Sequence, residues 1–319
     1  MRGKVPASRP NIALFSCRET ARQDAMTLPP DTPGAAGWRR RPLAASALGL
    51  VSVLATACSP LGMLNGMAPK RLSARDIPYG GAPRQTLDIY LPEGRAGTAP
   101  PRVVVFLYGG GWDSGTKEMY RFVGGALAAQ GFITVIPDYR LYPAVRYPTF
   151  LEDCAAAFAW VSANIGTWGG GEEIFLMGHS AGAYNAAMLA LDPRYLATAG
   201  SRLSPRGTIG LAGPYDFLPL GTDELRAIFG FPTSPATQPI NHVDGRNAPM
   251  LLIAGSADAT VLPRNTTRLA ARIRQAGGPA QDKIYPNINH QELIGAIGQP
   301  FRFLCPTLAD CLRFLRETA

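Results

Sequence analysis

EEIFLMGHSAGAYNAAMLAL, residues 172–191, combines a short apolar strand, a tight Gly-x-Ser-x-Gly turn and a long apolar helix. This is the context of a nucleophile elbow, a strained turn that exposes a serine hydroxyl between a strand and a helix. Gly178 and Gly182 have a mechanical role there, because a side chain at either position would collide with neighbouring backbone. The simpler alternative, that Ser180 is only a helix N-cap, needs no flanking glycines. We therefore predict that Ser180 is a nucleophile.

On both sides of this turn, short apolar strands alternate with helices. The runs VVVFL (103–107), ITVI (133–136) and MLLIA (250–254) are continuously apolar, as strands covered on both faces are. This pattern predicts an α/β domain with a mostly parallel sheet and helices on both faces. The expected strands are 87–90, 103–107, 132–136, 173–177, 208–212, 250–254 and 283–285, and the expected helices are 118–130, 149–164, 181–191, 266–275 and 308–316.

A serine hydroxyl needs a base to remove its proton, and the chain has three histidines. His179 adjoins the nucleophile, where strand geometry turns its side chain away, and His242 lies within a long insertion. His290 follows the last expected strand, and the order Ser, Asp, His along the chain suits this architecture. We predict that His290 is the general base.

The base in turn needs a carboxylate to orient it. Asp258 directly follows the expected strand 250–254 and precedes His290 by 32 residues, so we predict that it is the acid. Asp216, after the preceding strand, is the competitor, and we interpret it as structural or pocket-lining. Asp138 precedes the serine and is therefore in the wrong order, and we expect it to pair with Arg140 and brace a nearby loop.

Acyl transfer also needs donors for the negative oxygen of the tetrahedral intermediate. The segment Tyr108-Gly109-Gly110-Gly111-Trp112 follows the expected strand 103–107, and its glycines let backbone N–H groups approach a substrate oxygen. We predict Gly110, Gly111 and Ala181 as oxyanion donors, with Tyr108 and Trp112 beside the substrate. A phosphate cradle is the alternative, but the segment lacks the lysine and the helix start of a P-loop.

The motifs YGGGW (108–112), PDYRLYP (137–143), GHSAGAYNAAMLAL (178–191) and GSADATV (255–261), with the loop histidine, resemble the α/β-hydrolase superfamily. The resemblance is to its carboxylesterase branch, related to hormone-sensitive lipase, feruloyl-esterase-like enzymes and arylformamidases, and covers about residues 76–319. It implies an α/β-hydrolase fold, hydrolysis through an acyl-enzyme without a cofactor, and a triad of Ser180, Asp258 and His290. The family usually has His where this chain has Tyr108, so we expect different hydrogen bonds behind the glycine loop.

One stretch interrupts the alternation of strands and helices. Residues 218–247 are rich in Pro, Gly, Thr and Asn and are too long for a plain connection. We predict a small lid over the site, with Phe229, Phe231 and Ile240 lining the pocket. An inert surface excursion is the alternative.

The N-terminal residues have the layout of a signal peptide. Arg39, Arg40 and Arg41 precede the apolar segment 43–57, which is shorter than the roughly 20 residues that a membrane-spanning helix needs. We predict a leader over residues 1–57, a linker over 58–75 and a catalytic domain over 76–319. Met26 is an alternative start.

The sequence LATACS, residues 54–59, resembles a bacterial lipobox, although Ala55 stands where Leu is usual. The resemblance implies that Cys58 carries acyl chains that tether an exported domain to a membrane. Ordinary cleavage near Ala57, with a free periplasmic product, is the alternative.

Charge and cysteine content bear on partners. The chain has 31 Lys/Arg and 23 Asp/Glu, of which residues 1–57 hold eight and three, so the basic excess lies mainly in the leader. Without a basic run outside the leader, we expect no nucleic-acid partner. The five cysteines include no CxxC pair, which argues against a zinc site, and no metal is expected. Cys305 and Cys311 fit a small disulfide or two buried thiols equally well.

These features predict a serine carboxylesterase acting on small to medium acyl or aryl esters. An amide-cleaving enzyme of the same fold, an arylformamidase or a peptidase, is an alternative because it uses the same triad. A non-catalytic surface lipoprotein is the alternative from a different class.

Overall fold

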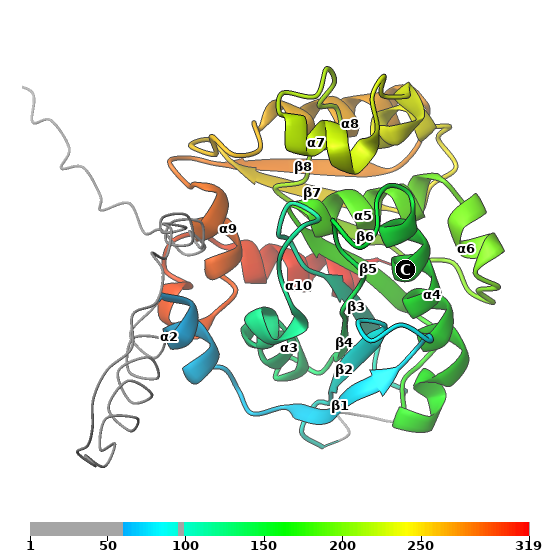
Figure 1. Ribbon diagram of the computed structural model, residues 1–319. Coiled ribbons are helices and arrows are strands. Elements are labelled where there is room, and N and C mark those ends of the chain that lie inside the picture. Colours follow the sequence, from blue (N-terminus) through cyan, green and yellow to red (C-terminus); the bar gives the residue numbers. More distant parts are fainter. Residues whose placement is uncertain (1–59, 95–98, 319) are drawn as a thin grey trace, which may run out of the picture.

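A computed structural model describes residues 60–94 and 99–318 of the chain (Figure 1). Its centre is an eight-stranded sheet in the order β1-β2-β4-β3-β5-β6-β7-β8. β2 pairs antiparallel with both β1 and β4, and the remaining neighbours are parallel. The strands are β1 (Leu72–Pro78), β2 (Thr86–Tyr90), β3 (Val103–Leu107), β4 (Ile133–Pro137), β5 (Ile174–His179), β6 (Thr208–Leu211), β7 (Met250–Gly255) and β8 (Ala280–Tyr285).

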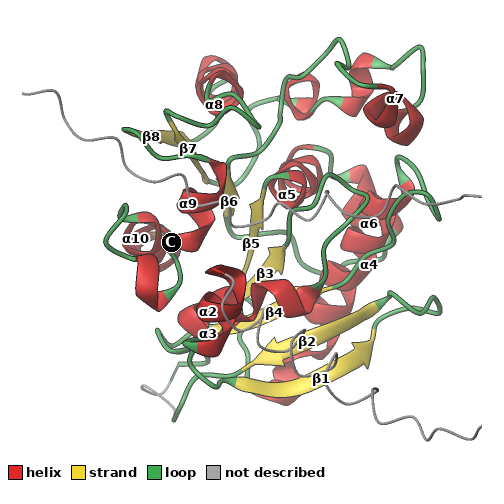
Figure 2. Ribbon diagram, turned by 60° about the vertical axis from the view of Figure 1, so that its left-hand side comes forward, coloured by secondary structure: helices red, strands yellow, loops and turns green. Residues whose placement is uncertain are grey.

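Helices cover both faces of this sheet, with α3 and α10 on one face and α4, α5 and α8 on the other (Figure 2). The helices are α2 (Pro60–Gly66), α3 (Arg121–Ala128), α4 (Thr149–Asn164), α5 (Ala181–Leu191), α6 (Arg194–Thr198), α7 (Asp223–Phe229), α8 (Arg264–Gln275), α9 (His290–Gly295) and α10 (Thr307–Glu317). Short 3₁₀ turns span Lys117–Tyr120, Ile165–Trp168, Pro235–Thr237, Pro239–His242 and Gln299–Phe301. In the part of the chain that the structure describes, no helix has the length and apolar character to cross a membrane.

The predicted fold class, a mostly parallel sheet between helices, is confirmed. β3, α4 and α5 have the predicted bounds, because apolar residues recur in each at the spacing of a strand or a helix. β3 and β5 are buried along their whole length, as strands covered on both faces must be. The helix expected over 118–130 is instead a 3₁₀ turn, Lys117–Tyr120, followed by α3.

The linker expected over residues 58–75 is wrong for its described part, because residues 60–66 form α2 and residues 72–78 form β1. Leu64 of α2 is fully buried, and a Cβ atom on Gly298 would lie only 2.1 Å from its Cδ2 atom. Burial of a leucine side chain contributes about 1.5–3 kcal/mol, which helps to hold a seven-residue helix that would not be stable in isolation. Residues 60–66 and 72–78 are therefore part of the globular body.

The structure also answers the question left open about the cysteines. Cys305 and Cys311 are free thiols, and both are buried. The Cys305 Sγ atom lies 3.2 Å from the Thr307 hydroxyl oxygen. Cys311 is fully buried in the main core cluster, and burial raises the pKa of its thiol.

Candidate active site

Ser180 stands at the turn between β5 and α5 with backbone angles of φ 56° and ψ −123°. A non-glycine residue in this region is strained, and the surrounding contacts hold it there. A Cβ atom on Gly178 would lie 2.2 Å from the Gly182 carbonyl oxygen, and one on Gly182 would lie 2.0 Å from the Leu107 carbonyl oxygen. The backbone N–H of Ser180 donates to the Leu211 carbonyl at 2.8 Å. The turn is therefore pinned between β3 and β6, which is the geometry of a nucleophile elbow.

Asp258 and His290 lie in direct contact although 32 residues separate them. The His290 Nδ1 atom is 2.7 Å from the Asp258 Oδ2 atom, and both residues are buried. The Asp258 Oδ1 atom accepts the backbone N–H groups of Thr260 at 2.9 Å and Val261 at 2.8 Å. Both oxygens of the carboxylate therefore have defined partners, and one of them orients the imidazole ring.

His290 opens α9 rather than lying in a plain loop. Asn289 caps this helix, since its side chain accepts the backbone N–H groups of Gln291 and Glu292 while the Glu292 carboxylate accepts the Asn289 N–H. This reciprocal capping fixes the start of the helix. The backbone that carries His290 is therefore ordered by its own local hydrogen bonds.

The ring of His290 lies beside the elbow, against His179. The two ring centroids are 4.7 Å apart, and the His179 Nε2 atom is 3.3 Å from the His290 carbonyl oxygen. Burial and the neighbouring His290 ring lower the pKa of His179 well below its usual value, so His179 stays neutral. Its Nδ1 atom faces the Tyr120 hydroxyl at 3.3 Å. The predicted base thus stands next to the residue that precedes Ser180, and the predicted acid is hydrogen-bonded to that base.

The glycine loop contacts the elbow from the side of β3. A Cβ atom on Gly109 would lie 2.9 Å from the Ser180 Cβ atom, and Gly110 and Gly111 have φ angles of 142° and 60°. Gly109 donates its N–H to the Tyr120 hydroxyl. Within residues 60–94 and 99–318, no protein group accepts the N–H of Gly110, Gly111 or Ala181. These three amides are therefore free to bind a substrate oxygen.

A cavity of about 410 Å³ opens beside Ser180. Of the predicted oxyanion and substrate-binding residues, Gly111, Trp112 and Ala181 line it, whereas Gly110 lies outside its lining. The other lining residues follow the carboxyl ends of β6 and β7 or belong to the insertion; they are Pro214, Asp216, Phe217, Leu218, Pro219, Leu225, Thr260, Val261, Leu262, Arg264 and Asn265. Sequence reasoning missed most of these, although loops at the carboxyl ends of strands are where ligands bind in open α/β sheets.

The insertion forms part of the pocket wall, but through other residues than predicted. Leu218, Pro219 and Leu225 reach the cavity. Phe229 packs against Trp112 instead, with ring centroids 4.8 Å apart, and Phe231 is 76% exposed. Ile240 packs against a second core cluster that includes Tyr215. The assignment of Phe229, Phe231 and Ile240 to the pocket is therefore wrong, because the apolar side chains of the insertion mostly pack beside the cavity or point outward.

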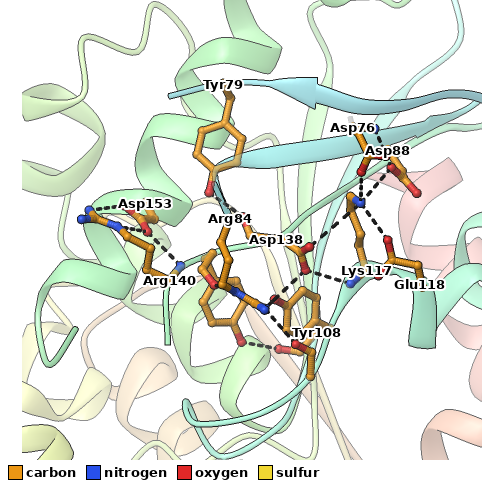
Figure 3. Close-up of polar contacts among 12 residues, drawn as sticks. Asp76, Tyr79, Arg84, Asp88, Tyr108, Lys117, Glu118, Asp138, Arg140 and Asp153 are labelled. Carbon is orange, nitrogen blue, oxygen red and sulfur yellow. Dashed lines mark hydrogen bonds and ion pairs between the residues drawn. The ribbon is translucent and has the colours of Figure 1, made fainter. Parts of the chain in front are cut away.

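Trp112 and Tyr108, at the two ends of the YGGGW segment, have different environments. Trp112 lines the cavity, and its Nε1–H donates to the Asn185 Oδ1 atom at 3.0 Å. Tyr108 is fully buried and accepts a hydrogen bond from Arg84 at 2.7 Å (Figure 3). The prediction that Tyr108 contacts substrate is wrong for this geometry, because its ring points into the protein behind the loop.

The two aspartates weighed against Asp258 are both engaged elsewhere. Asp216 lines the cavity and forms an ion pair with Arg268 at 2.8 Å. Asp138 does not pair with Arg140, contrary to expectation. It accepts the backbone N–H of Lys117 at 2.9 Å, while Arg140 binds the carboxylate of Asp153 on α4 (Figure 3).

His242 stands apart from the proposed base. Its ring Nδ1 atom lies 3.5 Å from the Asp192 carboxylate, and its Nε2 atom is 2.7 Å from the Ala236 carbonyl oxygen. These partners belong to the insertion and the end of α5.

Comparison with known proteins shows to which protein family the chain is related. The BD-FAE family model matches residues 87–273, more than half of the chain. Esterase LipC of Mycobacterium tuberculosis is 31% identical over 221 residues, which cover 63% of this chain and 55% of the relative. The isoprenylcysteine alpha-carbonyl methylesterase ICME of Arabidopsis thaliana is 30% identical over 243 residues, which cover 69% of this chain and 56% of the relative. The chain thus spans little more than half the length of these relatives.

Solved structures share the same fold. Esterase B from Lactobacillus rhamnosis, in an inhibited form, superposes with a TM-score of 0.70 and 20% identity over 85% of this chain and 96% of that one. A truncated carbohydrate esterase from gut microbiota gives a TM-score of 0.67 and 21% identity over 79% and 99%. The family match includes the glycine loop, the elbow and Asp258. The chain therefore belongs to the BD-FAE family, in the carboxylesterase branch of the α/β-hydrolase superfamily.

Proposed function

We propose that this protein is a serine carboxylesterase in which Ser180 is the nucleophile, His290 the general base and Asp258 the orienting carboxylate. The observation that carries the proposal is the 2.7 Å hydrogen bond between Asp258 and His290, placed beside a strained turn that presents Ser180 to a cavity. Relatives that are named as esterases support the proposed esterase activity.

The geometry supports a two-step acyl transfer. Because His290 donates its Nδ1–H to Asp258, its Nε2 atom carries the lone pair that accepts the Ser180 proton. The Ser180 oxygen then attacks the ester carbon, and the free N–H groups of Gly110, Gly111 and Ala181 stabilise the oxyanion. His290 returns the proton to the leaving alcohol, which leaves an acyl-serine, and water hydrolyses this intermediate by the same path.

The cavity suits a substrate of modest size with an apolar group. Its volume of about 410 Å³ lies at the small end of the range for small-molecule sites. Trp112, Phe217 and Leu218 contribute apolar surface, and Asp216 and Arg264 add charge. We therefore propose small to medium acyl or aryl esters as the substrate class.

A series of p-nitrophenyl esters from acetate to palmitate, assayed with the full chain and with Ser180→Ala, tests the proposal. We expect the short and medium esters to be hydrolysed fastest, and Ser180→Ala to lose several orders of magnitude in kcat. A fluorophosphonate probe should label the wild-type protein and leave Ser180→Ala unlabelled. Retention of full activity in Ser180→Ala, or no ester turnover and no labelling in the wild type, would refute the proposal.

The amide-cleaving alternative is tested in the same assay. N-formylkynurenine and an aminoacyl anilide, compared with the esters by kcat/KM, report any preference for amides. Faster cleavage of either amide than of every ester would make the protein an arylformamidase or a peptidase.

We also propose that the protein is exported and that Cys58 anchors it to a membrane through acyl chains. The support is the sequence pattern of residues 39–58, which lie outside the described residues. Metabolic labelling with a palmitate analogue in a bacterial host should mark the wild-type chain and not Cys58→Ala. Equal labelling of both chains, or of neither, contradicts the anchor.

A further inference from the structure

The hydrogen bonds behind the glycine loop converge on one guanidinium group, that of Arg84, which lies in the turn between β1 and β2 (Figure 3). Its Nη2 atom donates to the Tyr108 hydroxyl at 2.7 Å and to the Gly115 carbonyl at 2.8 Å. Its Nε atom donates to the Tyr139 carbonyl at 2.9 Å. Tyr108 precedes the loop and Gly115 closes it, so one side chain joins both ends of the loop.

Tyr108 is itself held from several sides. Its ring stacks on Tyr139, with centroids 4.7 Å apart, and on Tyr120, with centroids 5.9 Å apart. Its carbonyl accepts the Tyr139 hydroxyl at 2.7 Å, and the Asp138 carboxylate lies 3.5 Å from the Nη2 atom of Arg84. Asp138 also accepts the N–H of Lys117, just beyond the loop. This buried network therefore ties the loop to β4 as well as to Arg84.

Close backbone contacts transmit the position of this network to the nucleophile. A Cβ atom on Gly115 would lie 2.6 Å from the Gly109 carbonyl oxygen, and one on Gly110 would lie 2.1 Å from the Ser114 carbonyl oxygen. Gly109 in turn lies against Ser180. Because the loop is packed on itself and on the elbow, a shift at Gly115 moves the amides that face the substrate oxygen.

We propose that Arg84 and Tyr108 are positioning residues that hold the loop 109–115 so that the N–H groups of Gly110 and Gly111 face the oxyanion. The inference rests on the proposed function of Ser180. Neither Arg84 nor Tyr108 lines the cavity, so both act through the loop. Arg84 can serve both ends because a guanidinium group presents several N–H donors in a fixed planar arrangement.

Arg84→Met tests the inference, since it keeps the apolar stem and removes every donor. We expect kcat for p-nitrophenyl butyrate to fall about ten- to a hundredfold, with KM little changed, because donors aimed at the oxyanion act mainly in the transition state. A trifluoromethyl ketone forms an adduct whose oxyanion occupies the same amides, so its inhibition constant should rise by a similar factor. A purely structural role would not move the two quantities together.

Arg140→Met is the matched control. Arg140 has 34% of its side chain exposed against 35% for Arg84, and it also binds a buried aspartate, Asp153. Within residues 60–94 and 99–318 its side chain forms no hydrogen bond with the loop 109–115; its partner is the Asp153 carboxylate, at 2.7 and 2.8 Å. We expect its kcat and its inhibition constant to match the wild type.

Tyr108→Phe is the second test, and it decides the matter should Arg84→Met fail to fold. This change keeps the ring stack and removes only the hydroxyl, so kcat should fall and the inhibition constant rise in proportion. The inference is overturned when the folded variants keep wild-type kcat, or lose kcat with an unchanged inhibition constant. Failure of the proposed function is a separate outcome, in which the wild-type protein hydrolyses no ester and binds no fluorophosphonate.

Discussion

Asp258→Asn is the sharpest test of the triad, because the hydrogen bonds around this carboxylate decide which way an amide must turn. The Oδ1 atom accepts N–H groups from Thr260 and Val261, and the Oδ2 atom accepts Nδ1–H of His290. In the asparagine variant, an NH₂ group in the place of the Oδ1 atom would face the two N–H donors of Thr260 and Val261. The amide oxygen of the asparagine must therefore take that place. The NH₂ group is then forced toward His290.

This orientation reverses the tautomer of the base. An NH₂ group only donates, so His290 must accept at Nδ1 and carry its proton at Nε2. A ring protonated at Nε2 cannot take the Ser180 proton. The same change in the triad of a serine protease reduces kcat about 10⁴-fold, or roughly 5.5 kcal/mol of activation free energy, and we expect a similar loss here.

The assay is kcat on p-nitrophenyl butyrate, with circular dichroism to verify that the variant is folded. Asp216→Asn is the control, because Asp216 lines the same cavity but pairs with Arg268. We expect that control to change KM more than kcat. The assignment is refuted by an Asp258→Asn enzyme that keeps more than about a tenth of wild-type kcat, or by Asp216→Asn losing as much as Asp258→Asn.

Three further predictions concern stability and reactivity. Leu64→Ala should lower the free energy of unfolding by about 2–5 kcal/mol in urea titrations, because Leu64 is fully buried; a loss below about 0.5 kcal/mol would contradict its role in the core. Burial raises the pKa of Asp310, but hydrogen bonds from Lys283 and Tyr285 outweigh this effect and hold the pKa below its usual value. The ionised Asp310 therefore stabilises the folded state above about pH 4, and this contribution is lost as the pH falls further. The wild type should therefore lose more stability than Asp310→Asn between pH 5 and about pH 3, and equal losses in the two proteins would count against the ion pair. Burial also raises the pKa of the Cys154 and Cys311 thiols, so iodoacetamide followed by mass spectrometry should find both unmodified until denaturant is added; rapid labelling in the native state would contradict their burial.

Much of the fold follows from local patterns in the sequence. The run 103–107 is apolar over its whole length, and 149–164 and 181–191 are rich in apolar residues at helical spacing, so their burial shows directly in the sequence. β1 was missed because it is an edge strand with mostly partly exposed residues, which gives no continuous apolar run. α2 was missed because its stability comes from one buried leucine and not from a repeating pattern.

Some features of the candidate site also follow from the sequence, and others do not. The position of Ser180 at the turn and the pairing of Asp258 with His290 could be anticipated, because each of these residues follows a strand in an order that is typical of the fold. The partners of Asp138 and Arg140 could not be predicted. They are Lys117, 21 residues before Asp138, and Asp153, 13 residues after Arg140, and no local pattern in the sequence pairs them. The orientation of Tyr108 could not be predicted either, since its buried hydroxyl accepts an N–H of Arg84, a residue 24 positions away in the sequence.

Helix α2 begins two residues after Cys58. Two residues of extended chain reach only about 7 Å, far less than the diameter of a domain. An acyl chain on Cys58 would therefore hold the globular body against the lipid headgroups without a stalk. An enzyme anchored in this way would act on esters at the membrane surface and would not diffuse through the surrounding solution.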